Sequence, residues 1–213
     1  MRHLPNLITF SRIVVLIALV WLVMQNWTGA ATLAFLCILY GSISDFVDGH
    51  IARKYGLVTN FGKILDATVD KVMTLGAFVL LIWSGLFAWP LPTWGPLLAS
   101  VIVFFMAVRE FGITFLRFVA ARRDVVLAAE TSGKRKTIWQ VTGICVLFAV
   151  PMFERDVAAW MGTDLSLFAR FVHLNGYFYF LLAAWLTLSS GMSYFKKYGW
   201  MLMPGKAGPG TSS

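Results

Sequence analysis

Six long apolar stretches dominate this sequence and restrict the chain to a membrane-embedded fold. They cover roughly residues 7–25, 31–53, 61–84, 94–120, 136–153 and 168–191. Each is long enough to cross, or nearly cross, a hydrocarbon core about 30 Å thick at a helical rise of about 1.5 Å per residue. Charged residues make up only 13% of the chain, well below the usual share in a soluble domain. We therefore expect an all-α integral membrane protein with six transmembrane helices.

The first apolar stretch also has some features of a cleavable signal peptide. Arg2 precedes it, and the small residues of "WTGAATLA" follow it. Because five further apolar stretches come after it, we expect it to be retained as the first span. A single membrane domain is expected over residues 1–195, followed by a disordered cytoplasmic tail at 196–213.

Lysine and arginine alternate between the two ends of these spans, which predicts the orientation of the chain. Arg2 and Arg12 mark the first end, and the links near residue 54 and at 121–136 are also basic. The links at 26–30 and 84–95 have no basic residue. The positive-inside rule then places both termini in the cytoplasm. The net charge of +8 fits contact with the anionic cytoplasmic leaflet, and because the bases lie between apolar spans we expect no nucleic-acid binding.

Four aspartates gather near the cytoplasmic ends of the second and third stretches, although the whole chain has only ten acidic residues. Asp45 and Asp48 are spaced i, i+3, and Asp66 and Asp70 are spaced i, i+4. Residues at these spacings share a helix face. Since the two helices are antiparallel and joined by a short link, the two faces can meet. The four carboxylates would then point into one cavity.

Carboxylates held this close repel one another, and an aspartate in a membrane helix costs about 2.5–3.5 kcal/mol on insertion scales. Two divalent cations would balance the four negative charges, and oxygen ligands suit Mg²⁺ or Mn²⁺. Paired ions of this kind polarise phosphates and activate hydroxyl groups. Two other interpretations remain: aspartates solvated at the membrane surface, and an ion pathway through a divalent-cation transporter.

The stretch "DFVDGHIARKYGLVTNFGKILDATVD" resembles the signature of the CDP-alcohol phosphatidyltransferases, which are six-span membrane enzymes. The pattern is D-x-x-D-G-x-x-A-R followed, after eight residues, by G-x-x-x-D-x-x-x-D, and every fixed position matches. The resemblance covers nearly all of the chain except its tail. It implies transfer of a phosphatidyl group from CDP-diacylglycerol to the hydroxyl of a small alcohol, with release of CMP.

The resemblance also implies a role for each matched residue. The metal ligands would be Asp45, Asp48, Asp66 and Asp70. Asp70 is also similar to the general base that takes the hydroxyl proton, as a carboxylate within hydrogen-bond reach can do. The CDP-diacylglycerol site would include Gly49, Ala52, Arg53 and Gly62, with Thr59, Pro5, Asn6 and Thr9 as further positions.

Three further stretches indicate the acceptor alcohol. The opening "LPNLITFSRI" resembles the start of bacterial phosphatidylglycerophosphate synthases, and "REFGITFLR" and "SGKRKT" are similar to elements of the same enzymes. Their acceptor is glycerol 3-phosphate, a dianion that requires a basic pocket. The acceptor-phosphate ligands would be Arg109, Arg117, Lys134 and Lys136. The lysines could instead be topology determinants at lipid headgroups, and Arg109 and Glu110 could form a structural ion pair.

The resemblance therefore implies synthesis of phosphatidylglycerophosphate in a bacterial inner membrane, with the active site on the cytoplasmic side. A sister activity that forms cardiolipin, phosphatidylserine or inositol-phosphate lipids is the nearest alternative. A divalent-cation transporter is the alternative from another class. Relatives often form homodimers, so a homodimer is a further expectation for this chain.

Overall fold

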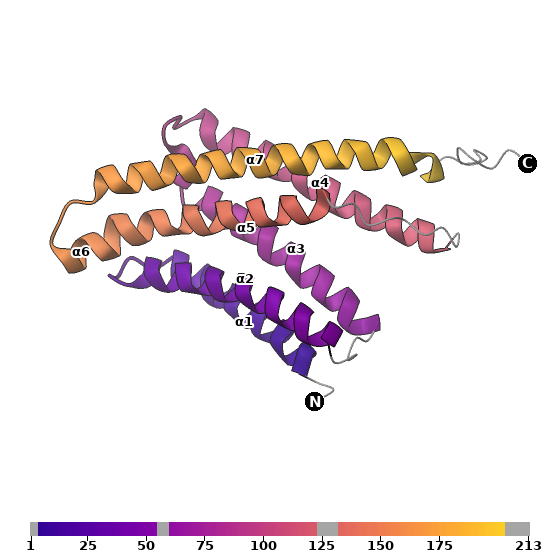
Figure 1. The fold of residues 1–213 in the computed structure, drawn as a ribbon. Helices are drawn as coiled ribbons and strands as arrows, with labels where there is room; N and C mark the ends of the chain where they lie inside the picture. Colours follow the sequence, from indigo (N-terminus) through magenta and orange to yellow (C-terminus); the bar gives the residue numbers. More distant parts are fainter. Residues whose placement is uncertain (1–3, 55–59, 123–131, 203–213) are drawn as a thin grey trace, which may run out of the picture.

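The computed structural model describes the backbone of residues 4–54, 60–122 and 132–202, and the side chains of residues 10–44, 67–120, 122 and 136–200. Every element within these residues is helical (Figure 1). The long helices are α1 (Leu4–Val23), α2 (Ala30–Lys54), α3 (Asn60–Trp83), α4 (Trp94–Arg122), α5 (Ser132–Pro151) and α7 (Ser166–Tyr198). The short segments are the 3₁₀ helices η1 (Leu86–Ala88) and η3 (Gly199–Leu202), the π-helix η2 (Met152–Val157) and α6 (Ala158–Met161). Each apolar stretch predicted from the sequence overlaps one long helix.

The long helices run back and forth between two ends of the molecule (Figure 1). One end carries the end of α2, the start of α3 and the end of α7, and we call it the aspartate end because Asp45, Asp48 and Asp66 lie towards it. The opposite end carries η1, α6 and the link at 162–165, and we call it the link end. Chain segments far apart in the sequence are therefore brought together at each end.

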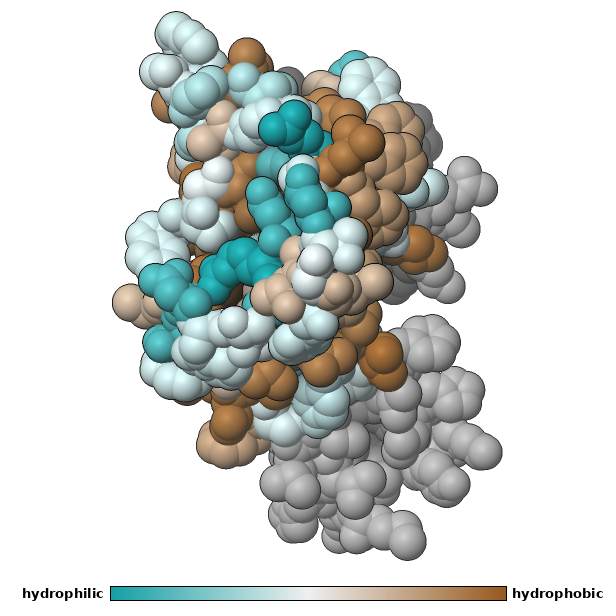
Figure 2. Space-filling model, turned by 90° about the vertical axis from the view of Figure 1, so that its left-hand side faces the viewer, coloured by the Kyte–Doolittle hydropathy of each residue, from teal (hydrophilic) through white to brown (hydrophobic). Residues whose placement is uncertain are grey.

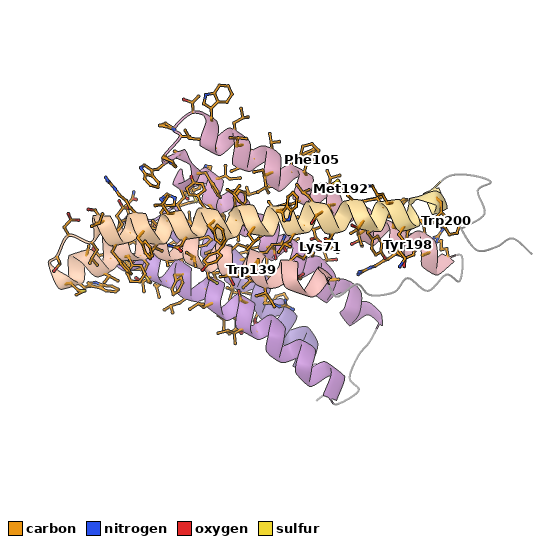
Figure 3. The ribbon with its side chains drawn as sticks, turned by 45° about the horizontal axis from the view of Figure 1, so that its top comes forward. Lys71, Phe105, Trp139, Met192, Tyr198 and Trp200 are labelled. Carbon is orange, nitrogen blue, oxygen red and sulfur yellow. The ribbon has the colours of Figure 1, made fainter. Side chains whose placement is uncertain are left out.

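Within the described residues, three helical stretches are long and apolar enough to cross a bilayer, namely Trp94–Ala120, Lys136–Met161 and Ser166–Tyr198. Shorter apolar stretches, Phe10–Val23 and Ala30–Ser44, lie on α1 and α2. The outer faces carry exposed apolar side chains, including Phe105 on α4 and Met192 on α7 (Figure 3). Extended apolar surface of this kind suits contact with lipid, so the chain has the character of a membrane protein.

The fifth helical stretch is longer than the range predicted from the sequence, which ended at residue 153. α5 continues through η2 and α6 without a link. Pro151 has no N–H group with which to continue the regular hydrogen-bond pattern, and a π-helical segment follows it instead of a helix end. The stretch stops at Gly162, whose φ of 63° lies in the left-handed region that glycine adopts without strain. Residues 154–156, expected in a link, therefore lie on helix.

α7 extends past the domain boundary expected at residue 195. Lys196 and Lys197 occupy its last turn, where positive charge interacts favourably with the negative end of the helix dipole. η3 continues as far as Leu202. Residues 196–202, expected to belong to a disordered tail, are therefore helical, and residues 203–213 lie outside the described residues.

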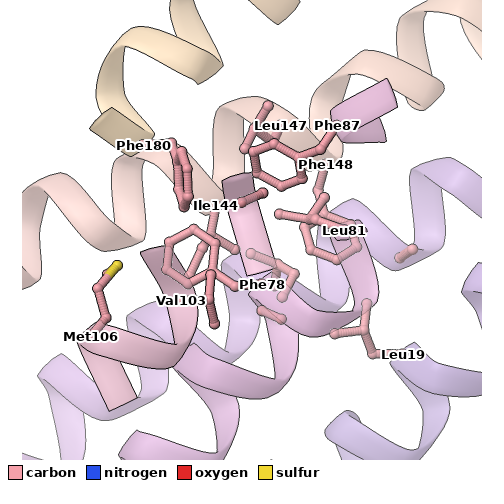
Figure 4. Close-up of a cluster of buried hydrophobic side chains, with 14 of the residues drawn as sticks. Leu19, Phe78, Leu81, Phe87, Val103, Met106, Ile144, Leu147, Phe148 and Phe180 are labelled. Atoms are coloured by element: carbon pink, nitrogen blue, oxygen red, sulfur yellow. The ribbon is translucent and has the colours of Figure 1, made fainter. Parts of the chain in front are cut away.

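The core forms where α5 packs along α7, with α3 and η1 against them (Figure 4). The ring of Phe180 on α7 lies 5.3 Å from that of Phe78 on α3 and 4.8 Å from that of Phe87 on η1. Both spacings are typical of tilted, edge-to-face aromatic packing. α5 approaches α7 closely at Gly143, where an added Cβ atom would lie 3.3 Å from the backbone nitrogen of Phe180. Small residues allow membrane helices to pack this tightly.

Candidate active site

The aspartates predicted to hold metal ions lie on the two helices expected for them. Asp45 and Asp48 fall in the last part of α2, and Asp66 and Asp70 fall in the first half of α3. The backbones that carry these residues lie towards the aspartate end of the molecule (Figure 1). The side chain of Asp70 is described, whereas the side chains of the other three aspartates lie outside the described residues.

α2 and α3 touch next to these aspartates. The tip of the Met73 side chain on α3 reaches Gly41 of α2, where an added Cβ atom would be 2.6 Å from Met73 Cε. Asp45 and Asp48 follow Gly41 at i+4 and i+7, and Asp70 precedes Met73 by three residues. Residues at these spacings lie on one face of a helix. The contact is therefore on the faces of α2 and α3 that carry the aspartates.

Asp70 lines a narrow cavity between α1, α2, α3 and α5. The cavity has a volume of about 50 Å³, and its walls include Arg12, Ser42 and Thr137. Arg12 is only 1% exposed. From the sequence, this arginine is expected to be a flanking charge that sets orientation. In the structure it lies well inside α1, is buried and lines this cavity, which corrects that interpretation. A charged residue inside a membrane helix already indicates a functional role, so the signal was present in the sequence.

A second polar cluster joins α4, α5 and α7. Lys136 forms an ion pair with Glu110 Oε1, and Arg109 Nη1 lies 3.2 Å from the same oxygen. Arg109 Nη2 also donates a hydrogen bond of 2.8 Å to Ser190 Oγ. The exposed fraction of the side chain is 10% for Lys136, 11% for Arg109 and 17% for Glu110. One carboxylate thus holds two cations in a largely buried site, and we call this group the Glu110 cluster.

Gly191 of α7 makes room for the Glu110 cluster. An added Cβ atom at this position would lie 2.5 Å from Arg109 Cγ, so a larger residue would displace the arginine stem. The charges of Asp70, Arg109 and Lys71 all act on Lys136. Lys71 projects from α3 and is labelled in Figure 3. Thr137, which follows Lys136 directly, lines the cavity beside Asp70, so the cavity and the Glu110 cluster adjoin each other.

The four residues predicted to bind the acceptor phosphate are not all brought together. Arg109 and Lys136 meet at Glu110, whereas Arg117 is exposed further along α4 and its charge acts on Lys71. The Lys134 side chain lies outside the described residues. The ion pair of Arg109 with Glu110, weighed as an alternative, is present.

Sequence reasoning missed several members of this region. Lys71 follows Asp70 directly, so its place beside the motif was a visible signal. Lys136 was not expected as the second partner of Glu110. Ser190 is one of many small polar residues in an apolar helix, and nothing in the sequence marks it as the partner of Arg109.

The positions predicted for CDP-diacylglycerol lie on α1, α2 and α3. Pro5, Asn6 and Thr9 belong to the first half of α1. The end of α2 carries Gly49, Ala52 and Arg53, and the start of α3 carries Gly62. The side chains at these positions, and the whole of Thr59, lie outside the described residues. Among the side chains that are described, no group of three or more histidine, cysteine, aspartate or glutamate residues could hold a metal ion.

Comparison with known proteins gives consistent matches over most of the chain. Residues 2–171 match the family model for CDP-alcohol phosphatidyltransferases. The chain is 31% identical over 209 residues to the CDP-diacylglycerol–glycerol-3-phosphate 3-phosphatidyltransferase of Bacillus subtilis (strain 168), covering 92% of this chain and 95% of the relative. It is 30% identical over 195 residues to the protein of the same name from Rickettsia bellii (strain RML369-C), covering 92% and 94%. It is also 32% identical over 150 residues to a cardiolipin synthase (CMP-forming) of Oryza sativa subsp. japonica, covering 68% and 45%.

Proposed function

Since this chain belongs to the CDP-alcohol phosphatidyltransferase family, we propose that it transfers the phosphatidyl group of CDP-diacylglycerol to glycerol 3-phosphate. The products are phosphatidylglycerophosphate and CMP. Relatives named for this reaction match the chain over nearly its full length. The structural observation that carries the proposal is that the cavity lined by Asp70 and Thr137 adjoins the ion pair of Lys136 with Glu110. This arrangement places a carboxylate near two cations, as transfer of a phosphatidyl group to a phosphorylated acceptor requires.

The four aspartates of α2 and α3 are the proposed ligands of two divalent cations, Mg²⁺ or Mn²⁺. The contact of the Met73 side chain with Gly41 supports this assignment because both residues lie on the helix faces that carry the aspartates. Carboxylate oxygens are the ligands that these hard cations prefer. When bound, the ions would supply positive charge that stabilises the diphosphate and acidifies the acceptor hydroxyl.

Asp70 is the proposed general base. Its side chain is half-buried and lines the cavity between α1, α2, α3 and α5. In the reaction, the acceptor oxygen forms a bond to the β-phosphorus, and the bond from this phosphorus to the oxygen of CMP breaks. Asp70 takes the proton of the acceptor hydroxyl, and the electron pair of the broken bond leaves with CMP. Arg53 is proposed to pair with the diphosphate, since its planar fork can bind two oxygens.

Arg109 and Lys136 are the proposed ligands of the acceptor phosphate. Glu110 and Ser190 hold these two cations in place without substrate. The pairing of one carboxylate with two cations leaves one positive charge in excess, which attracts a dianion such as glycerol 3-phosphate. Arg117 and Lys134 are proposed to add positive charge around the same site.

We also propose that all six long helices cross the membrane, with both termini and the aspartate end in the cytoplasm of a bacterium. These helices have between 20 and 33 residues, so even the shortest spans about 30 Å. CDP-diacylglycerol would then reach the aspartate end by lateral diffusion in the cytoplasmic leaflet of the inner membrane. A single catalytic domain that includes α7 through Tyr198, and a homodimer, belong to the same proposal.

The acceptor profile tests this function. Purified protein is given CDP-diacylglycerol, Mg²⁺ or Mn²⁺ and one acceptor at a time, and CMP release is followed. CMP release with glycerol 3-phosphate alone supports the proposal. Release only with phosphatidylglycerol would assign the second candidate function, cardiolipin synthesis, which the similarity to the rice enzyme favours. Release only with serine or an inositol phosphate would assign one of the other sister activities. No release with any acceptor, together with metal flux in liposomes, would contradict the enzyme and favour a transporter.

A further inference from the structure

A hollow of two adjoining parts lies at the link end, opposite the aspartates. One part is a polar cavity of about 280 Å³ whose walls include Glu154, Arg170 and His173. The other is an apolar groove of about 630 Å³ lined mainly by leucine and phenylalanine side chains of α7. Trp89 and Arg170 line both parts. Figure 2 looks onto this end and shows hydrophilic residues gathered at its centre with apolar residues beside them.

Hydrogen bonds and ring contacts fix the wall between the two parts. His173 Nε2 lies 2.8 Å from the carbonyl oxygen of Leu86. The single proton of the Tyr177 hydroxyl is shared between the carbonyl oxygen of Trp89 and that of Leu86, which lies 3.3 Å from the hydroxyl oxygen. The His173 ring stacks on Tyr177 with centroids 5.0 Å apart, and its centroid lies 5.3 Å from that of Trp89. A hollow with fixed walls loses little conformational entropy when a ligand binds.

Two opposite charges line the polar cavity without pairing to each other. Arg170 and Glu154 are both exposed, and neither forms a hydrogen bond or ion pair with another residue in the described part of the chain. The charge of Arg170 acts on Asp164, a carboxylate that also accepts a hydrogen bond of 2.8 Å from the backbone nitrogen of Ser166. A positive and a negative group in one cavity complement a ligand that carries a phosphate and an ammonium group.

The apolar groove continues along the outside of α7 towards the middle of the bilayer. Its first members, Leu167, Phe171 and Leu174, recur at i, i+4 and i+7. Phe178 and Leu181 extend the same face at i+11 and i+14, and all five side chains are between 53% and 81% exposed. This apolar face is about 21 Å long at the helical rise, which exceeds half of a hydrocarbon core about 30 Å thick. It is long enough for an acyl chain of one leaflet.

We propose that this hollow binds a zwitterionic phospholipid with a primary-amine head group. The phosphate lies at Arg170, the ammonium group lies at Glu154, and one acyl chain lies along the apolar face of α7. A primary ammonium group donates hydrogen bonds to a carboxylate, which a quaternary ammonium group does not. The site lies at the end opposite Asp70, so it takes a lipid from the other leaflet and is independent of the proposed transfer reaction.

Native mass spectrometry of the full chain tests this site. The protein is released from nanodiscs that contain equal amounts of phosphatidylethanolamine, phosphatidylcholine and phosphatidylglycerol, and the retained lipid is identified. The wild type should retain phosphatidylethanolamine about two- to fivefold more often than the other two lipids, since an exposed charge pair is worth about this factor. Arg170→Gln should lower the retention of phosphatidylethanolamine about two- to fivefold for the same reason. Glu154→Gln should remove the preference over phosphatidylglycerol.

Arg155→Gln is the matched control. Arg155 lies at the same end, but it does not line the hollow and its Nη2 donates to the carbonyl oxygen of Gln25. The Arg155→Gln variant should retain as much phosphatidylethanolamine as the wild type. CMP release by each variant in detergent micelles shows that the chain is folded, because none of these residues belongs to the proposed active site.

Three results would contradict the proposal. Equal retention by the wild type, Arg170→Gln and Arg155→Gln would remove Arg170 from any lipid site. Equal retention of the three lipids by the wild type would refute the head-group assignment. A dimer that Phe171→Asn dissociates, with no change in lipid retention, would assign the apolar face to a second copy of the chain.

Discussion

Glu110 of α4 and Lys136 of α5 form a largely buried ion pair that links two helices. The same Glu110 oxygen lies 3.2 Å from Arg109 Nη1, so one carboxylate serves two cations. Removing one member of a buried ion pair leaves the remaining charge uncompensated. The two contacts of Glu110 hold Arg109 and Lys136 in position before substrate arrives. Two cations paired with one carboxylate leave one positive charge for an anionic acceptor.

Lys136→Ala tests this cation as an acceptor ligand. We expect the KM for glycerol 3-phosphate to rise about tenfold or more, since a hydrogen bond to a charged group contributes about 1.5–3 kcal/mol. The KM for CDP-diacylglycerol should change much less. Steady-state CMP release measures both constants. Lys197→Ala, at an exposed lysine in the last turn of α7, is the control. Equal changes in the two KM values would remove Lys136 from the acceptor site.

Gly191→Ala tests the position of Arg109 without removing a charge. The added Cβ atom would lie 2.5 Å from Arg109 Cγ, so the arginine must move away from Ser190. Overpacking costs about 1–3 kcal/mol, and we expect a rise of about fivefold or more in the KM for glycerol 3-phosphate. Gly199→Ala is the matched control because an added Cβ atom there meets nothing within 4 Å. Identical KM values for the two variants would show that the position of Arg109 does not affect binding of glycerol 3-phosphate.

Asp156→Ala tests a contact that ties the fifth helical stretch to the start of α2. Asp156 is fully buried, and its Oδ2 accepts hydrogen bonds from the Thr32 nitrogen at 2.7 Å and the Thr32 hydroxyl at 2.8 Å. Loss of these bonds should lower the free energy of unfolding by about 1–3 kcal/mol. The Tm of the purified protein should fall by about 2–4 °C for each kcal/mol in a chain of this size.

The control for this contact is Glu154→Ala, which changes an exposed carboxylate two residues away. Thr32→Val removes the hydroxyl that donates to Asp156. If the contact stabilises the fold, the Tm losses of Asp156→Ala and Thr32→Val should not add in the double variant. Fully additive losses would show that the two residues act independently.

Asp70→Asn tests the general base. An amide cannot take the acceptor proton. Because general base catalysis contributes about 10²- to 10⁴-fold in rate, turnover should fall at least about 10²-fold. Binding of CDP-diacylglycerol should be partly retained. CMP release and donor binding are measured on the same preparation, with Asp164→Asn at the link end as control. Substantial residual turnover would contradict the base assignment.

The sequence predicts the helices of this fold better than their contacts. The family resemblance and the positions of the apolar helices follow from patterns that are local in the chain, and the family match confirms the resemblance. The predicted end of the fifth stretch, at residue 153, was wrong because Pro151 and the charged residues 154–156 resemble a link. In the structure a π-helix accommodates the proline, and Asp156 finds a hydrogen-bond partner on α2.

The site was predictable to the extent that its residues share a motif. Asp45, Asp48 and Asp70 belong to one spacing pattern, so the helices that carry them could be named from the sequence. The partners that fix Arg109 come from α5 and α7, and no local pattern reports which hydroxyl of α7 faces α4. Arg12 was misassigned because it was grouped with Arg2 as a flanking charge, although its position inside the first apolar stretch already indicated a buried residue.

The central claim is that aspartates from α2 and α3 form one site loaded with divalent cations, and metal analysis combined with activity tests it most directly. The purified chain is exhaustively chelated, its bound Mg²⁺ and Mn²⁺ are measured by elemental mass spectrometry, and CMP release is assayed before and after either ion is restored. We predict that chelation abolishes CMP release, that either ion restores it with about two ions bound per chain, and that Asp66→Asn lowers this binding. Full activity in a chelated protein that holds no divalent metal would contradict the claim.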